Sequence, residues 1–311
     1  MRDNIANFGG DPDRLTLWGQ SAGAISIDNY NHAYTEDPIV SGLIMNSGTS
    51  QLMLVNPDVE HINFTFVARH FGCNNSSPAA EIDCLRDVNG STITSYLKQY
   101  AESGTLPVMN FFPVVDNRTQ LANYTGQNIS GLPAIIGTVR GEGTTFMSYN
   151  RTYGVDEPTA DLMNLQYFHC PAVQTTQDRY AANAITFRYL YAGNFSNISP
   201  LWWAGPYHSS DLPLIFGTYG LARGEGTDFE KETSEQMQDF WLAFAEDPVN
   251  GLPKLGWDAY EPGGEAVLLG HNGRAVQSIG EDKMEAPCSG LAPNGLPMPA
   301  LPDGGEGMKV Q

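Results

Sequence analysis

The sequence predicts an α/β fold in which a mostly parallel central sheet is flanked by helices. The runs "RLTLW" (14–18) and "SGLIMNSG" (41–48) have the composition of short buried strands. Between them, "AGAISIDNYNHA" (22–33) starts with small residues and continues as a helix of ordinary length. The order strand, tight turn, helix, strand is typical of parallel sheets. With 311 residues, 41% of them hydrophobic, the chain can form one large domain or two modest ones.

The remaining elements follow from local patterns of apolar and turn-forming residues. "RDNIANF" (2–8) predicts a short helix that ends at two glycines. A Pro- and Gly-rich end, residues 291–311, predicts a flexible tail after a domain of residues 1–290. In chain order we expect helices at 58–72 and 91–101, strands at 111–116 ("FFPVVD") and 132–138 ("LPAIIGT"), a helix from 143–149, a strand at 185–193 ("ITFRYLYAG") and a long helix at 230–247.

The charge balance excludes two classes of partner. Sixteen basic and thirty-five acidic residues give a formal charge of −19, which repels nucleic acid phosphates and anionic lipid headgroups. No apolar run approaches the roughly 20 residues that a membrane helix needs. The first residues, "MRDNIANFGG", also contain no apolar core of a signal peptide. The sequence therefore predicts a soluble chain with an acidic surface, no membrane span and no nucleic acid partner.

Glycosylation motifs nevertheless indicate a secreted glycoprotein. One Asn-x-Ser/Thr sequon carries little information, but a high density of them is typical of proteins that pass through the secretory pathway. The sequons lie at Asn63, Asn74, Asn75, Asn89, Asn117, Asn123, Asn128, Asn150, Asn194 and Asn197.

The cysteines favour disulfide bonds. Cys73, Cys84, Cys170 and Cys288 form an even set without the Cys-x-x-Cys spacing of zinc or thioredoxin sites. A bond that closed the short Cys73 to Cys84 loop would contribute about 3 kcal/mol by restricting the unfolded chain. Buried free thiols are the alternative.

Ser21 lies in "GQSAG" (19–23), a Gly-x-Ser-x-Gly motif between the first strand and the helix that follows it. A turn sharp enough to expose the serine brings its neighbours together, and the small residues Gly19, Ala22 and Gly23 avoid clashes there. The helix that begins at Ala22 points its free N–H groups toward negative charge that develops near Ser21. We therefore interpret Ser21 as a nucleophile.

An activated serine requires a base, and the base requires a carboxylate that fixes its tautomer. Glu142 follows the run 132–138 in a glycine-flanked loop, so its side chain can turn back toward the carboxyl edge of the sheet. Asp116, at the end of the run 111–116, is the alternative acid. His208 lies in the aromatic-rich loop "WWAGPYHSSDLP", and chain order selects it among the histidines.

Several blocks of the sequence resemble the type-B carboxylesterases, a family that includes acetylcholinesterase and fungal lipases. The segment "RDNIANFGGDPDRLTLWGQSAGA" resembles the family's nucleophile segment, and the later blocks occur in the family's order across residues 1 to about 290. The resemblance implies an α/β-hydrolase fold with Ser21 as nucleophile, Glu142 as triad acid and His208 as general base. The later blocks are "LIMNSGTS", "FFPVVDN", "IIGTVRGEGTTF", "FHCPA" and "GPYHSSDLPLIFGT".

The resemblance also implies roles for neighbouring residues. The Ala22 backbone N–H is expected to donate to the oxyanion, and Ser47 resembles a residue that supports the triad. Gln20 stands where many relatives have a glutamate, and a neutral side chain there disfavours a preference for cationic esters. The resemblance further implies that Cys73 pairs with Cys84, and it leaves Cys170 and Cys288 as a second pair.

Two departures from the family pattern bear on activity. The chain begins just before the nucleophile turn, so we expect it to lack the N-terminal strands and the glycine-rich loop that supplies further oxyanion donors. Loss of one such donor lowers rates by about 10²- to 10³-fold. The interval from Glu142 to His208 is also shorter than in the family. Both features suggest a truncated or misassembled gene product.

The sequence therefore predicts a serine hydrolase of carboxylic esters that works through an acyl-enzyme and acts on small-molecule or lipid esters. A catalytically impaired fragment and a non-catalytic, cholinesterase-like binding domain are the alternatives, although such binding domains usually lack the nucleophile that is present here. No metal-binding cluster or phosphate-binding loop occurs, so we expect no metal and no cofactor.

Overall fold

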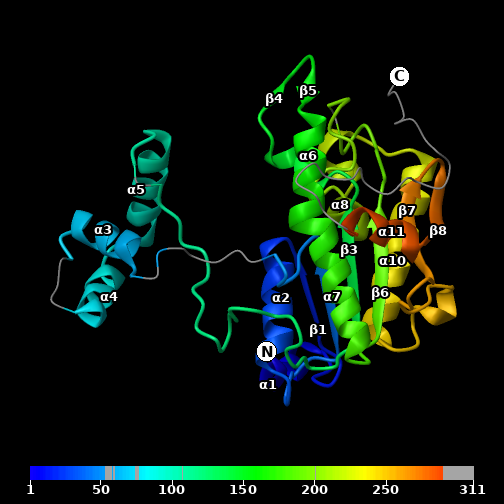
Figure 1. The fold of residues 1–311 in the computed structure, drawn as a ribbon, viewed down its shortest axis with the longest axis horizontal. Coiled ribbons are helices and arrows are strands. Elements are labelled where there is room, and N and C mark those ends of the chain that lie inside the picture. Colours follow the sequence, from blue (N-terminus) through cyan, green and yellow to red (C-terminus); the bar gives the residue numbers. More distant parts are fainter. Residues whose placement is uncertain (53–57, 59, 74–76, 107, 200, 290–311) are drawn as a thin grey trace. The chain divides into compact units, whose positions relative to one another are not determined.

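The computed structural model (Figure 1) forms two compact units. One unit consists of Met1–Leu52 and Asn123–Gln311, and the other of Met53–Ala122. The predicted tail 291–311 and the sequons at Asn74 and Asn75 lie outside the described residues. The structure describes residues 1–52, 58, 60–73, 77–106, 108–199 and 201–289.

A six-stranded sheet forms the centre of the first unit. Its strand order is β1-β2-β3-β6-β7-β8, and all neighbouring strands pair in parallel except β7 and β8. The predicted fold class, an α/β protein with a mostly parallel sheet, is therefore confirmed. The strands are β1 (Thr16–Gln20), β2 (Gly42–Asn46), β3 (Ala134–Val139), β6 (Thr186–Tyr191), β7 (Glu265–His271) and β8 (Arg274–Gly280).

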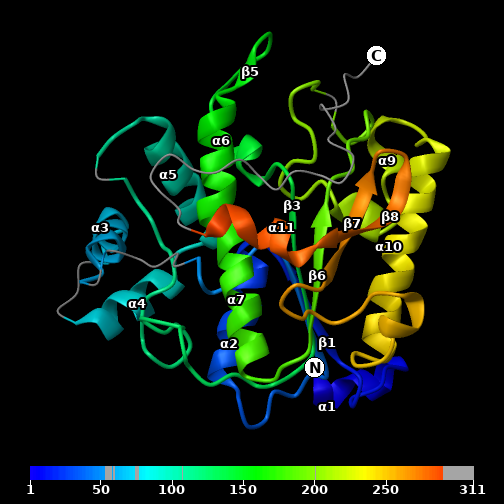
Figure 2. The same cartoon turned by 45° about the vertical axis from the view of Figure 1, so that its right-hand side comes forward.

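Helices cover both faces of this sheet (Figure 2). The helices α2 (Ala22–Ala33) and α7 (Cys170–Ala181) pack on one face, and α10 (Asp228–Glu246) packs on the other. Successive side chains of a strand point to opposite faces. Accordingly, Leu43 packs with α2 residues, whereas its neighbour Ile44 belongs to the cluster on the α10 side. Because the sheet is buried on both faces, the sequences of its strands are nearly continuous apolar runs.

Aromatic rings fill the core between the sheet and α10. Phe187, Tyr189 and Tyr191 project from β6 into this layer and are fully buried. The ring centroids of Tyr189 and Trp241 lie 5.3 Å apart in an edge-to-face arrangement, which is one of the geometries that aromatic pairs prefer. This packing fixes β6 against α10 and thereby positions the loop that follows β6.

Two disulfides are present, and both match the pairs that the resemblance implies. Cys73 bonds Cys84 inside the second unit, and Cys170 bonds Cys288 in the first. In the described residues of the second unit, the helices are α3 (Ile62–His70), α4 (Pro78–Arg86) and α5 (Gly90–Glu102).

Two predicted elements are wrong. Residues 111–116 form no strand, because Pro113 removes a backbone donor and no described strand pairs with this exposed segment. Residues 143–149 form no α-helix, since only the 3₁₀ turn η2 (Glu142–Phe146) is present there. The other elements are α1 (Arg2–Ile5), η1 (Ala6–Phe8), β4 (Tyr149–Asn150), β5 (Gly154–Val155), α6 (Glu157–Asn164), η3 (Leu165–His169), α8 (Leu212–Ile215), α9 (Gly220–Arg223), η4 (Pro253–Leu255), α11 (Glu281–Glu285) and η5 (Ala286–Cys288).

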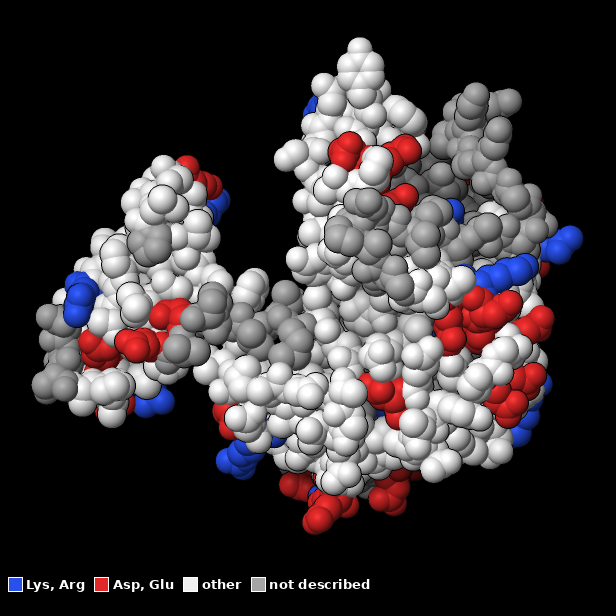
Figure 3. Space-filling view, in the orientation of Figure 1, with Lys and Arg blue, Asp and Glu red and all other residues white. Residues whose placement is uncertain are grey.

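Acidic side chains are more abundant than basic ones on the face of the molecule that Figure 3 shows. Figure 3 shows several separate groups of acidic side chains on the unit that contains the sheet, with few basic side chains among them. This agrees with the formal charge of −19. Among the helices that the structure describes, none has the length and apolar character to cross a membrane.

Candidate active site

Ser21 occupies a strained turn between β1 and α2. Its backbone angles are φ 56° and ψ −123°, a region that residues other than glycine seldom adopt. The turn is held from both sides, because the Ser21 N–H donates to Asn46 O at 2.9 Å and Ser21 O accepts from Ile25 N at 3.0 Å. Ala22 begins the helix and is exposed, and its N–H, as the first of α2, has no acceptor within that helix.

Close backbone approach explains the glycine at position 19. A Cβ atom there would lie 2.5 Å from the carbonyl carbon of Gly23, a separation that side chains do not tolerate. Gly48 is constrained in the same way, since its Cβ would lie 2.6 Å from Ser21 O. Gly23 is not constrained in this way, because a Cβ atom there meets no described atom within 4 Å.

Glu142 and His208 form a buried pair at the carboxyl edge of the sheet. His208 Nδ1 lies 2.5 Å from Glu142 Oε2, and the other carboxylate oxygen accepts from Val139 N at 2.8 Å. The two loops are joined by their backbones, since Gly141 N donates to Pro206 O at 2.9 Å. An ionised carboxylate only accepts hydrogen bonds, so this contact places the ring proton on Nδ1.

The other ring nitrogen of His208 faces the Ser21 turn. His208 Nε2 lies 3.0 Å from Gln20 Nε2, and Gln20 directly precedes Ser21. With its proton on Nδ1, a neutral imidazole accepts at Nε2, so the Gln20 amide is the donor. Among the described residues no hydrogen bond joins His208 to the Ser21 hydroxyl. The basic nitrogen is therefore bonded to Gln20, the residue that directly precedes Ser21.

Aromatic rings surround the imidazole. The His208 ring lies 5.1 Å from Phe146 and 4.9 Å from Phe168, and these two rings stack on each other at 5.7 Å. Phe168 is buried, whereas Phe146 is 47% exposed. Phe146 thus presents an accessible apolar face next to the imidazole.

Comparison with known proteins identifies the family of the chain. The model of the Carboxylesterase family matches residues 1–158 and 155–283. The chain belongs to the carboxylesterase family.

Fungal and animal members of the carboxylesterase family are similar to the chain over most of its length. It is 39% identical over 304 residues to the chlorogenic acid esterase of Aspergillus niger, and the match covers 92% of this chain and 59% of that protein. It is 38% identical over 311 residues to secreted lipase 5 of Gibberella zeae, with 93% and 58% covered. Identity to the acetylcholinesterase of Bungarus fasciatus is 24% over 323 residues, with 84% and 52% covered. The chain thus spans less than two thirds of the length of these relatives.

A second buried carboxyl group, that of Asp211, lies close to the Glu142–His208 pair. Asp211 Oδ2 accepts from the Tyr189 hydroxyl at 3.1 Å and from Asn46 Nδ2 at 3.4 Å. Burial raises the pKa of Asp211 to about 6, and the negative charge of Glu142 adds to this effect. Sequence reasoning missed Asp211, although it stands three residues after His208 in the block "HSSDLP".

Ser47 also lies at this edge, directly after β2. It is fully buried with φ 57°, and its N–H donates to Gly137 O at 2.8 Å. Its hydroxyl has no hydrogen-bond partner among the described residues. Ser47 therefore places a buried polar group next to Gly48, which itself contacts the backbone of Ser21.

Asp116, the alternative acid, has a local role instead. Its Oδ1 accepts from the backbone N–H groups of Arg118, Thr119 and Gln120 at 2.8 to 2.9 Å. These bonds hold the pKa of this exposed carboxyl far below its usual range. Asp116 thus stabilises a turn, and Glu142 is the acid that the structure brings to His208.

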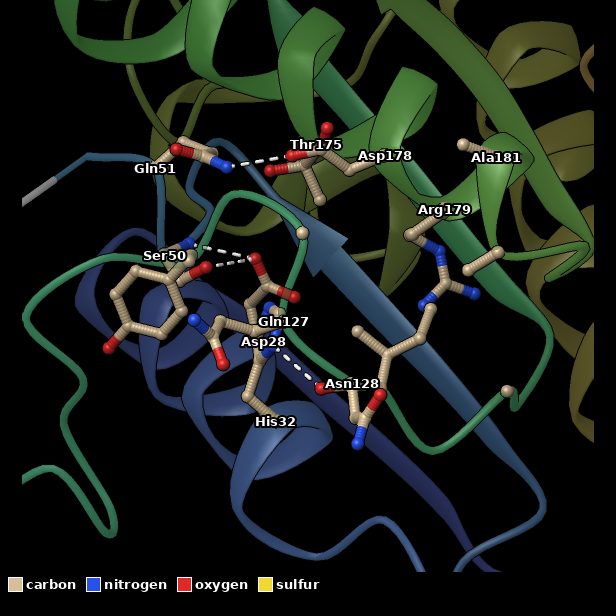
Figure 4. Close-up of a pocket in the computed structure, with 15 residues that line it drawn as sticks. Asp28, His32, Ser50, Gln51, Gln127, Asn128, Thr175, Asp178, Arg179 and Ala181 are labelled. Carbon is tan, nitrogen blue, oxygen red and sulfur yellow. Dashed lines mark hydrogen bonds between the residues drawn. The ribbon is translucent and has the colours of Figure 1, made fainter.

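The chain also has a cavity of about 430 Å³, lined by residues of α2, α7 and their neighbouring loops (Figure 4). None of Ser21, Glu142 and His208 lines it. Figure 4 shows Asp28 accepting from the backbone and the hydroxyl of Ser50, at 2.9 and 2.7 Å. The cavity therefore contains contacts that fix α2 to the segment after β2. Within the described ranges, no cluster of three His, Cys, Asp or Glu residues could hold a metal ion.

Proposed function

We propose that this chain hydrolyses carboxylic esters with Ser21 as nucleophile, His208 as general base and Glu142 as the acid that orients the base. The observation that carries the proposal is the orientation of the His208 ring. Its Nδ1 is fixed by buried Glu142, and its Nε2 lies beside the residue that precedes Ser21. A serine triad requires a carboxylate at one ring nitrogen and the serine hydroxyl at the other. The contact with Glu142 supports the first of these roles, and the position of Gln20 next to Ser21 in the chain supports the second.

The reaction begins when His208 Nε2 exchanges its bond to Gln20 for one to the Ser21 hydroxyl. The Ser21 oxygen then attacks the ester carbonyl carbon, and its proton moves to Nε2. Glu142 stabilises the resulting imidazolium, and the Ala22 N–H donates to the oxyanion. As the carbon–oxygen bond to the alcohol breaks, His208 returns the proton to the leaving oxygen. Water repeats these steps on the acyl-enzyme and releases the acid.

The substrate class follows from the surroundings of His208 and from the relatives. Phe146 offers an exposed apolar ring beside the imidazole, which suits esters with aromatic or aliphatic groups. One relative is named a chlorogenic acid esterase and another a lipase. We therefore place small-molecule and lipid esters first. The neutral Gln20 beside the base gives no reason to expect a preference for cationic esters.

An extracellular location fits the same comparisons. A similar fungal protein is named a secreted lipase, and the chain contains two disulfides, which persist in oxidising compartments. We therefore infer that the chain acts outside the cell.

Covalent labelling tests the catalytic assignment directly. The purified chain is treated with a fluorophosphonate, and intact mass reports the labelled fraction. We expect one label per chain, its loss in Ser21→Ala, and unchanged labelling in Ser26→Ala, which alters an exposed serine of the same helix. A folded chain that takes no label, or a Ser21→Ala variant that is still labelled, would overturn the proposal. The first result would support a non-catalytic binding role.

A further inference from the structure

The sequons differ in what their side-chain amides do in the folded chain. In three of them the asparagine is exposed and its Oδ1 accepts from the backbone N–H of the Ser or Thr two residues later. The three bonds are Ser91 N to Asn89 at 2.9 Å, Thr125 N to Asn123 at 3.1 Å and Thr152 N to Asn150 at 2.8 Å.

This shared geometry leaves the nitrogen of each amide free. The backbone bond engages the oxygen, and among the described residues Nδ2 of Asn89, Asn123 and Asn150 makes no hydrogen bond. Nδ2 is the atom to which a sugar is attached in N-linked glycans. Asn150 stands in the β4–β5 hairpin, which projects from the top of its unit in Figure 1. At these three positions an attached sugar would extend into solvent.

Asn197 shows the opposite arrangement. It is only 9% exposed, and its Nδ2 donates to Tyr219 O at 3.2 Å. Its neighbour Ile198 is buried in the core cluster, and Arg223 donates to the backbone oxygen of Asn197 at 3.2 Å. A sugar on this nitrogen would need space that protein atoms fill. A chain glycosylated at Asn197 therefore cannot reach this fold.

We propose that Asn89, Asn123 and Asn150 carry N-linked glycans in the exported protein and that Asn197, despite its sequon, does not. The inference rests on the proposed extracellular location and is independent of the catalytic assignment. The remaining described sequons, which are half-buried or make other contacts, lie outside the proposal. They are Asn63, Asn117, Asn128 and Asn194.

The modification is a group transfer from a lipid-linked oligosaccharide diphosphate. A bond forms between Nδ2 and the anomeric carbon of the first sugar, while the bond from that carbon to the diphosphate oxygen breaks. The diphosphate leaves with the electron pair, and the amide loses one proton to a base of the host transferase. No oxidation or reduction takes place.

Site-resolved mass spectrometry tests the proposal. The full chain is exported from yeast behind an added signal peptide, so its natural route does not affect the result. An endoglycosidase trims each glycan of the folded, secreted protein to one N-acetylglucosamine before peptide analysis. We expect most molecules to carry this sugar at Asn89, Asn123 and Asn150 and to have an unmodified Asn197. A modified Asn197 in folded protein, or an asparagine of the three that is unmodified in most molecules, would overturn the proposal.

Matched variants give a second readout that does not depend on peptide recovery. Thr152→Ala removes the sequon of Asn150 and keeps the backbone donor, so the intact mass should fall by one glycan with little change in Tm. Asn197→Gln should leave the glycan mass unchanged and lower Tm by several degrees, because it disturbs the bond to Tyr219. A loss of glycan mass in Asn197→Gln would contradict the assignment.

Discussion

The Nε2 atom of His208 lies 3.0 Å from the amide nitrogen of Gln20, the residue immediately before the strained Ser21. The two residues are 188 positions apart in the chain, so this contact joins the Ser21 turn to the loop after β6. It holds the imidazole against the side chain of the residue that precedes Ser21. We therefore expect Gln20 to act as a positioning residue for His208.

Gln20→Glu should shift the acidic limb of the pH–rate profile upward by roughly one pH unit, because a carboxylate at this distance favours the charged imidazolium. The base form would then be available only at higher pH. Initial rates of ester hydrolysis across the pH range measure this shift. Gln20→Met, which has similar length and no charge, is the control: it removes the donor without adding a charge, so its limb should move much less than that of Gln20→Glu. An unshifted limb in Gln20→Glu would contradict the contact.

Glu142→Gln should lower kcat by roughly 10⁴-fold while the chain remains folded, because a neutral amide no longer fixes the tautomer or stabilises the imidazolium. Steady-state kinetics with a soluble ester give the rate, and circular dichroism verifies the fold. Asp116→Asn is the matched control for the alternative acid and should retain full activity. The assignment fails if Asp116→Asn loses activity and Glu142→Gln keeps it.

Gly19→Ala should destabilise the chain by about 1–3 kcal/mol, because the new methyl group would lie 2.5 Å from the Gly23 carbonyl carbon. Gly23→Ala tests the other half of the same approach and should be neutral or slightly stabilising, since its methyl group meets open space and alanine favours helices. Thermal unfolding of the two variants measures the difference. Equal Tm values would show that the turn has room at position 19.

Asp211→Asn should stabilise the protein near neutral pH and much less near pH 4. Burial raises the pKa of Asp211 to about 6, so the folded state binds this proton more tightly than the unfolded chain does. The free energy of unfolding therefore falls as pH rises from about 4 to about 6, and above this window the buried charge costs up to roughly 3 kcal/mol. The amide keeps an acceptor for Tyr189 and cannot ionise. Tm of both proteins at about pH 4 and about pH 7.5 tests this, and an equal gain at both values would contradict it.

The sheet and the local turn at Ser21 could be predicted because both depend on short stretches of sequence. The runs that became β1, β2, β3 and β6 are apolar and bounded by turn residues, as buried parallel strands are. The hairpin of β7 and β8 was missed, although "HNGR" contained its signal. Asn272 and Gly273 both adopt positive φ there, and an Asn-Gly pair between apolar runs favours such a hairpin.

The contacts around His208 could be predicted only in part. Motif order and family resemblance indicated Glu142 and His208 as acid and base, because each follows a recognisable strand. The bond between Gln20 and His208 and the burial of Asp211 both depend on how segments far apart in the sequence pack against each other. Local sequence contains no information on that packing, so these two contacts required the structure.

The separation of these residues along the chain also sets the order in which the site can assemble during synthesis. Ser21 and the strands β1 and β2 leave the ribosome long before His208, roughly 10 to 40 seconds earlier at ordinary elongation rates of about 5–20 residues per second. Gln20 and Glu142, the two partners of His208, precede it by 188 and 66 positions. Both contacts therefore form late, and each requires the closure of a long loop. A growing chain thus contains the strained Ser21 turn for some time before the histidine that we propose as its base has been made.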